Sequence, residues 1–416
     1  MFYGWILLAY VSACYFAIVG GGFYGFTVVM PNMIETQGWS RTVGSVGVSI
    51  MMMTFGLNAP LIAILIARIK THGTMLLGGL IVTLGCIVLY YSNSVLAFYM
   101  GSLLLGVGFS TTSIVPGSHL ITQWFNRRRS MALGIFMASG GLGAFVFAPV
   151  FAQVIESTGD WRNVWFYVAV IGISVGVTGF FIIRERPSDV GQHIDGIDPN
   201  DDVGNGGKPL RPARVHKSVE NWSQREAFHT RVFWLILFAS CIVMTGNAIV
   251  TSQLVLHLTD LGISQVVAAS ALGVVGALNT VGRFSGGILG DLIEPKLLML
   301  LGMILEFLGI YALISADQEF LVYLFAVLFG LGFGLYLVAF TSVVVNYFGA
   351  KNYARIFALM GLCYTLFIAS GPILAGYAYD RLGSYDLPFY VILGLGAFAT
   401  LALLMMKPPV KPPAST

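Results

Sequence analysis

The chain has 416 residues, of which 57% are hydrophobic and 10% are charged, and its formal net charge is +3. Soluble domains carry about 25% charged residues, so this composition excludes a water-soluble globular protein and predicts a membrane protein. Runs of about 20 apolar residues, the length that a helix needs to cross a bilayer core, recur along almost the whole chain. Twelve such runs are predicted, at 5–30, 43–67, 74–92, 96–123, 130–155, 163–183, 232–257, 266–290, 297–315, 320–346, 354–379 and 386–406.

The apolar runs are continuous and do not alternate with polar residues, which favours helices over the strands of a membrane barrel. The first run is not followed by a small-residue cleavage site, so we expect a retained helix and not a signal peptide. The predicted fold class is an all-α membrane protein with twelve transmembrane helices.

Basic residues give the orientation of these helices. Eighteen lysines and arginines fall on the side of the N-terminus, against Arg41, Arg162 and Arg381 on the other side. Because basic loops stay in the cytoplasm, both termini are predicted to be cytoplasmic, in a multi-pass protein of the plasma (inner) membrane. The run NRRRS at 126–130 then orients a loop at the membrane, and no nucleic-acid partner is expected.

One long polar segment separates six predicted helices from the next six. The predicted domains are an N-terminal bundle at 1–183, a flexible cytoplasmic linker at 184–231, a C-terminal bundle at 232–406 and a cytoplasmic tail at 407–416. Within the linker, WSQREAFHT at 222–230 favours a short surface helix.

The two halves are repeats of one another. Residues 124–149 match 347–372 at an offset of 223, and residues 39–67 match 263–291 at an offset of 224, each of the latter pair opening with a serine suited to cap a helix. Parallel six-helix repeats around a central cytoplasmic loop resemble the architecture of the major facilitator superfamily, in which the substrate binds at mid-membrane between the halves.

Arg283 lies in the middle of the run 266–290, where a charge costs about 2.5–3.5 kcal/mol on insertion scales. The matching position in the first half is Ala59, so the repeated scaffold does not require this charge. A guanidinium offers five donors in a planar fork that binds a carboxylate through two parallel bonds. The alternative is a structural ion pair, but Glu306 is the only carboxylate well inside a predicted span. We therefore predict that Arg283 binds an anionic substrate.

Further polar side chains are candidates for the same site. Asn279 lies one turn before Arg283 on the same helix face, where it holds the guanidinium, contacts a substrate oxygen or packs between helices. Tyr336 is a polar aromatic residue near mid-span, with either a ligand role or a membrane-facing one. Thr112 and Ser113 either face the cavity or bond back to their own helix.

Three residues are candidates for coupling or gating. His119 lies near the cytoplasmic end of its helix. It either changes its protonation near physiological pH, as histidine can, or contacts lipid headgroups. Glu306 has the chemistry of a proton carrier, although the third helix of each triplet is expected to be peripheral; otherwise it is a structural carboxyl. Asp291 is a cytoplasmic gate or a helix-end contact. The chain has no phosphate-binding P-loop and no CxxC pair, so we expect no ATP, other cofactor or metal.

Several stretches together resemble the monocarboxylate porters of the major facilitator superfamily. They are FYGW near the N-terminus, the passage WFNRRRSMALGIFMASGGLG, the helix with Arg283, and FGLGFG. The resemblance implies transport of lactate, pyruvate or similar short carboxylates, usually with a proton, with Arg283 binding the carboxylate. Two positions depart from the animal members: Asn279 replaces an aspartate, and Val28 a lysine, that the resemblance would place there.

The sequence thus predicts a monomeric secondary carrier that works by alternating access. Arg283 binds the carboxylate, the other polar candidates hold its oxygens, Tyr24 lines the cavity, and apolar residues around Val28 and Phe340 limit substrate size. The alternative within transport is exchange of organic anions, as in the oxalate and formate antiporters. An enzyme is not expected, because no nearby pair of His, Asp or Glu occurs within the helices.

Overall fold

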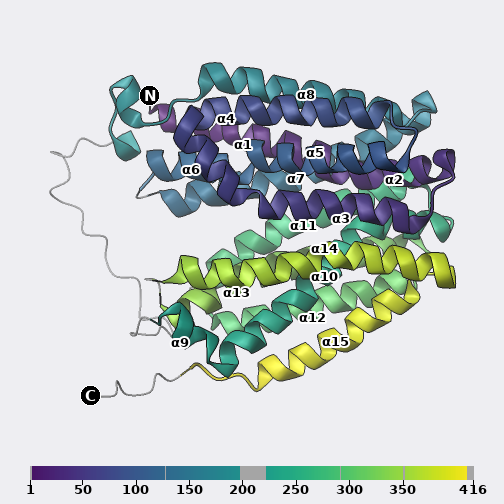
Figure 1. Cartoon of the computed structure of the whole chain (residues 1–416). Helices are drawn as coiled ribbons and strands as arrows, with labels where there is room; N and C mark the ends of the chain where they lie inside the picture. The colour runs from purple at the N-terminus through teal and green to yellow at the C-terminus, as the bar shows by residue number, and fades with distance from the viewer. Residues whose placement is uncertain (1, 127, 197–221, 291, 350–351, 410–416) are drawn as a thin grey trace. The chain divides into compact units, whose positions relative to one another are not determined.

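The computed structural model of the chain describes residues 2–126, 128–196, 222–290, 292–349 and 352–409. All regular structure in these ranges is helical (Figure 1). Eleven of the described helices are long and apolar enough to cross a membrane, and Arg41–Leu57 is a shorter apolar helix. The predicted all-α membrane fold is therefore confirmed.

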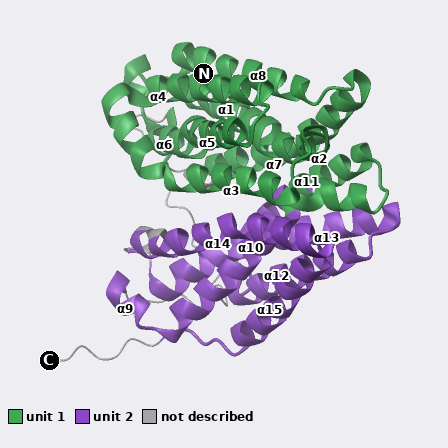
Figure 2. Cartoon of the chain, turned by 45° about the vertical axis from the view of Figure 1, so that its right-hand side comes forward, with its two compact units in different colours: residues 1–209, 251–277 green, residues 210–250, 278–416 purple. Residues whose placement is uncertain are grey.

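The chain divides into two compact units, coloured separately in Figure 2. The first comprises Met1–Pro209 and Thr251–Ala277. Within it α4 packs on α5 and α8, α3 packs on α5, and a π-helical segment packs on α7. Its elements are α1 (Tyr3–Tyr15), the π-helix η1 (Phe16–Phe23), α2 (Tyr24–Gln37), α3 (Arg41–Leu57), α4 (Ala59–Tyr90), α5 (Val95–Thr112), α6 (Ile114–Trp124), α7 (Arg129–Thr158), α8 (Arg162–Ile182), and the 3-10 turns η2 (Pro187–Val190) and η3 (Ile194–Gly196).

The second unit comprises Leu210–Val250 and Leu278–Thr416. In it α12 packs on α13 and α15, and α14 contacts α13 and α15. The short helix expected near 222–230 is present as α9, with a capping box between Ser223 and Glu226. The helices are α9 (Gln224–Phe228), α10 (Arg231–Asp260) and α11 (Gln265–Leu289), which both extend into the first unit, α12 (Pro295–Ile314), α13 (Glu319–Phe348), α14 (Tyr353–Leu382) and α15 (Asp386–Leu404).

The segment 251–277 joins the first unit through polar contacts. Arg41 pairs with Asp260 at 2.7 Å. Gln253 Nε2 donates to Ser45 Oγ at 2.9 Å, and Gln265 Nε2 donates to Asn32 Oδ1 at 2.7 Å. Packing thus groups parts of α10 and α11 with helices that precede them by about 200 residues, whereas the predicted domains 1–183 and 232–406 follow chain order and stay a prediction.

Three of the predicted spans are not single regular α-helices. The first contains η1, whose glycines let the backbone of Gly20 touch that of Gly143 on α7. The span 43–67 is interrupted at Asn58, before Pro60. The span 96–123 breaks at Ser113, whose φ and ψ are −121° and −104°. The last break follows from Pro116, because a proline ring clashes with the carbonyl four residues earlier. Val95–Trp124 is nevertheless one span, as predicted, with a local break inside it.

A sharp turn inside α4 separates the second predicted span from the third. Lys70 has a φ of 61°, which is costly for a residue with a side chain. Glu185 offsets this cost by accepting hydrogen bonds from the Thr71 backbone N–H at 2.6 Å and from the Thr71 hydroxyl at 2.9 Å. A carboxylate at the start of the next helical stretch also complements the helix dipole.

Helix α13 contacts α12 through glycines, so the two backbones approach closely. A Cβ atom built on Gly302 of α12 would lie 2.6 Å from the backbone nitrogen of Tyr336 and 2.7 Å from the carbonyl oxygen of Gly332. Gly332 in turn faces the backbone of Glu306. Even one methyl group has no space in this contact, as is common where small residues join membrane helices.

We therefore expect Gly302→Ala to lower the midpoint of thermal unfolding in detergent. Overpacking costs about 1–3 kcal/mol, which exceeds the gain of up to ~1 kcal/mol in helix propensity from the same change. The matched control is Gly394→Ala, because nothing lies within 4 Å of a Cβ there. A Gly302→Ala protein as heat-stable as this control, measured by size-exclusion recovery after heating, would contradict the packing described.

Candidate functional site

Arg283 and Asn279 form a pair one turn apart on α11. The Arg283 Nε donates to Asn279 Oδ1 at 2.8 Å, the Asn279 side chain is 8% exposed, and Arg283 is half-buried. Within the described part of the chain, no carboxylate lies at ion-pair distance from Arg283, and its terminal nitrogens donate to no side chain or carbonyl. The guanidinium is thus oriented by a neutral amide, and no described residue supplies a counter-charge.

Helix α13 packs against the backbone of Asn279 and Arg283. Gly334 faces the Asn279 carbonyl, and a Cβ atom built on Gly334 would lie 2.9 Å from the Arg283 backbone nitrogen. A Cβ atom on Gly282 would likewise lie 3.0 Å from Gly334 Cα. This contact fixes the height of Arg283 on α11 relative to Tyr336, which follows Gly334 by two residues on α13.

Tyr336 is fully buried and hydrogen-bonded. Its hydroxyl donates to Ser240 Oγ of α10 at 2.9 Å, and Ser240 donates onward to the Ile236 carbonyl at 2.8 Å. The ring stacks on Phe340, with centroids 6.1 Å apart and planes 7° apart. The membrane-facing alternative for Tyr336 is therefore excluded. The sequence did not single out Ser240, because a mid-span serine bonded to its own helix is an ordinary feature.

Phe340 links this cluster to the next helix. It is fully buried, and its ring lies 5.4 Å from that of Phe357 and 6.5 Å from that of Tyr364, both on α14. Phe340 thus forms part of an aromatic wall beside Tyr336. Its predicted influence on substrate size stays a prediction.

Glu306 lies inside the second unit and not on its periphery. Its exposed fraction is 0%, and neither carboxyl oxygen has a hydrogen-bond partner among the described residues. A Cβ atom on Gly246 of α10 would lie 3.8 Å from Glu306 Oε1, and the Glu306 backbone faces Gly332 of α13. Glu306 is therefore buried against α10 and α13. As expected, it forms no ion pair with Arg283 among the described residues, and its role in proton coupling stays a prediction.

The predicted residues of helices α2 and α5 belong to the first unit. Thr112 Oγ1 donates to the Gly108 carbonyl at 2.9 Å, and the Ser113 hydroxyl donates to the Phe109 carbonyl, so both use their donors within the helix. Val28 is fully buried, and its carbonyl accepts from Gln265. Tyr24 is half-buried at the start of α2. The ligand roles of these four residues stay predictions.

His119 borders a polar cavity of about 640 Å³ in the first unit. Acidic and basic side chains share its lining with His119, namely Lys70, Glu185, Arg186 and Asp189. His119 and charged side chains of both signs thus border the same cavity, and its coupling role stays a prediction. The predicted gate residue Asp291 lies outside the described residues.

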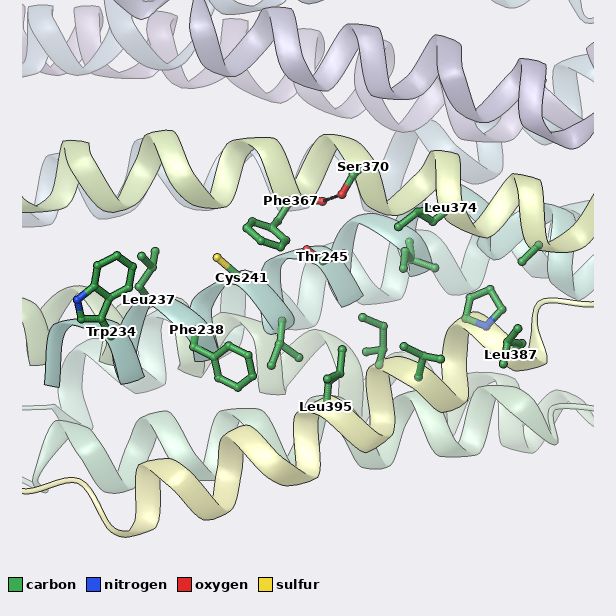
Figure 3. A pocket seen from close by; sticks show the side chains of 16 residues that line it. Trp234, Leu237, Phe238, Cys241, Thr245, Phe367, Ser370, Leu374, Leu387 and Leu395 are labelled. Carbon is green, nitrogen blue, oxygen red and sulfur yellow. Dashed lines mark hydrogen bonds between the residues drawn. The ribbon is translucent and has the colours of Figure 1, made fainter. Parts of the chain in front are cut away.

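A second cavity, of about 580 Å³, lies among α10, α14 and α15 of the second unit (Figure 3). Trp234, Phe238, Phe367, Leu374 and Leu395 are among the side chains that line it. Its wall is almost wholly apolar, and no predicted site residue contributes to it. It has none of the charged donors that would hold a carboxylate, in contrast to the Arg283 region.

Comparisons with known proteins agree with the helical architecture. The family model described as Major Facilitator Superfamily matches residues 12–293 and 281–416. The chain is 24% identical to monocarboxylate transporter 13 of Rattus norvegicus, over 96% of this chain and 89% of that one, and 24% identical to monocarboxylate transporter 2 of Homo sapiens, over 96% and 84%. A bacterial homologue of the human lysosomal transporter Spinster, solved inward-facing and occupied, has a similar fold, with a TM-score of 0.73, 15% identity and 97% of each chain covered.

The hydrogen bond between Tyr336 and Ser240 can be tested by a double-mutant cycle. Tyr336→Phe should lower the free energy of unfolding by about 0.5–1.5 kcal/mol, the net value of a hydrogen bond. Ser240→Ala should cost a similar amount, and the double variant should be less destabilised than the sum of the two. Strictly additive shifts in thermal midpoints would mean that the two hydroxyls do not interact.

Proposed function

The chain belongs to the major facilitator superfamily, and we propose that it carries short monocarboxylates such as lactate or pyruvate. As a member of this family it is a multi-pass membrane transporter and not an enzyme. The observation that carries the proposal is the uncompensated charge of Arg283. An arginine in a membrane span is costly unless it is paired, and no described carboxylate pairs with it. A substrate carboxylate supplies the missing charge and accepts the two parallel bonds that a guanidinium offers.

The surroundings of Arg283 suit a small substrate with one carboxylate. Asn279 engages Nε, so the terminal nitrogens remain for the substrate. Tyr336 and Phe340 are stacked, buried aromatic side chains of the same unit, and the proposal assigns them contact with a short aliphatic chain. The proposal keeps Val28, Tyr24, Thr112 and Ser113 of the first unit as further substrate contacts. To donate to a substrate oxygen, the Thr112 and Ser113 hydroxyls would have to leave the carbonyls of Gly108 and Phe109 that they now bond to. The names of the similar proteins above support the same substrate class.

Transport would proceed by alternating access around one central site, as in superfamily members built from two six-helix repeats. We propose a monomer in the plasma (inner) membrane with both termini in the cytoplasm, from the positive-inside distribution of charge. Proton symport is the first candidate for energy coupling. Exchange of organic anions is the second, and one observation favours it: the residue beside Arg283 is a neutral amide without a proton to give.

Removal of the guanidinium should weaken substrate binding strongly. Truncating one partner of a buried charge pair costs about 2–5 kcal/mol, so Arg283→Ala should weaken lactate binding at least ~30-fold. Arg283→Lys keeps the charge but loses the fork and should recover only part of the affinity. The measurement is radiolabelled lactate uptake and binding with purified protein in proteoliposomes.

The matched control for this experiment is Arg381→Ala. Arg381 is an exposed arginine in the last turn of α14, where it lies over the Tyr377 ring at 5.4 Å. Its removal should leave uptake unchanged. A folded Arg283→Ala protein that transports lactate as fast as the Arg381→Ala protein would refute the proposed role.

The substrate class and the coupling mode can be separated by one competition series. Mono- and dicarboxylates of two to six carbons should compete with labelled lactate, and the short monocarboxylates should compete best, because one guanidinium compensates one carboxylate. Uptake that rises with an inward proton gradient indicates symport, whereas uptake that requires an internal carboxylate indicates exchange. Preference for dicarboxylates would contradict a site with one arginine.

A further inference from the structure

The buried carboxyl of Glu306 is not explained by the proposed substrate site alone. The side chain is fully buried in α12, and neither oxygen has a partner among the residues that the structure describes. An ionised carboxylate in such surroundings is very costly without a cation or a set of donors. A carboxyl in this position therefore carries a proton, unless its surroundings change.

Among the described residues of the neighbouring helices, no lysine or arginine pairs with this carboxyl. The titratable group on the facing segment of α13 is Tyr336, whose hydroxyl donates to Ser240. On α10, Gly246 faces Glu306. A titratable group of that helix, the thiol of Cys241, lies near Tyr336. On α15 the titratable residues Asp386 and Tyr390 are exposed, and Ile392 lies at the contact with Gly246. Lys296, on the same helix as Glu306, donates to the carbonyls of Leu404 and Met406.

A short structural path joins Glu306 to the arginine. Gly332 of α13 faces the Glu306 backbone, and Gly334, two residues later, faces the backbone of Asn279 and Arg283. Tyr336 belongs to the same segment and donates to Ser240. Because these contacts are between backbones, a shift of α11 on substrate binding would displace α13 and change the surroundings of Glu306.

We propose that Glu306 binds the proton that accompanies the substrate, with Tyr336 as the positioning residue that joins it to the Arg283 site. The proposal rests on the transport function above. In this proposal Glu306 on α12 supplies the acidic group that Asn279 on α11, a neutral amide, cannot supply. His119, the other titratable candidate, belongs to the first unit and borders a cavity lined by both signs of charge.

The charges balance over one cycle. The substrate carboxylate neutralises the Arg283 guanidinium, and one proton from the outer solution forms an O–H bond with a Glu306 carboxyl oxygen. The loaded protein then has no uncompensated charge in the membrane at either residue. When the site opens to the cytoplasm, the O–H bond breaks, the proton passes to water, and the substrate leaves as an anion.

The first test detects the proton itself and needs no substrate. Infrared difference spectra between acidic and alkaline pH are recorded on the full chain in lipid bilayers. The wild type should show the carbonyl stretch of a protonated carboxyl that titrates, and Glu306→Gln should lose this band. Glu306→Asp should retain a band at a shifted frequency, which keeps the test decisive if the glutamine variant folds poorly. A spectrum unchanged by Glu306→Gln would overturn the proposal.

The second test measures coupling. Lactate uptake in proteoliposomes is compared with and without an inward proton gradient, and Glu306→Gln should lose the stimulation by the gradient. The matched control is Glu294→Gln, which changes the carboxyl at the N-terminal end of the same helix and should keep the stimulation. Full stimulation in Glu306→Gln would overturn the proposal. A wild type that binds the proton in the infrared test but moves no monocarboxylate would instead refute the proposed function.

Discussion

The hydrogen bond from Arg283 to Asn279 is the interaction on which the site depends, because it orients a charge without neutralising it. A carboxylate at the position of Asn279 would pair with the guanidinium and compete with an anionic ligand. The amide accepts one bond from Nε at 2.8 Å and leaves the net charge intact. A charge that is oriented but not neutralised inside a membrane span leaves the protein less stable than a fixed ion pair would; in the proposed function, a substrate carboxylate supplies the missing free energy.

The second unit holds this charge through backbone contacts of α13. Glycines at 302, 332 and 334 bring α12 and α11 against α13 without intervening side chains. Rigid helices joined in this way keep Arg283, Tyr336 and Glu306 at fixed heights along the unit. The same close contacts couple the three helices, so a movement of one of them displaces the others.

Irregular backbone occurs in the first unit at specific, compensated places. The Lys70 turn is capped by Glu185, and the break at Ser113 precedes Pro116. At that break, the hydroxyls of Thr112 and Ser113 bond to carbonyls of the preceding turn. Non-helical backbone persists inside a membrane only where its polar groups are satisfied by protein. Thr112 and Ser113, which the sequence suggested as ligands, therefore also donate hydrogen bonds to backbone carbonyls at this break.

The sequence by itself determined the membrane class, the helical fold and the isolation of Arg283, because hydrophobic length and charge are properties of composition and order. It also indicated the pair with Asn279, since residues four apart share a helix face. Only the tertiary structure decided that Tyr336 is buried and bonded to Ser240, and that Glu306 points into the second unit. Such facts depend on the rotation of each helix about its axis, and that rotation is set by packing between residues far apart in the chain.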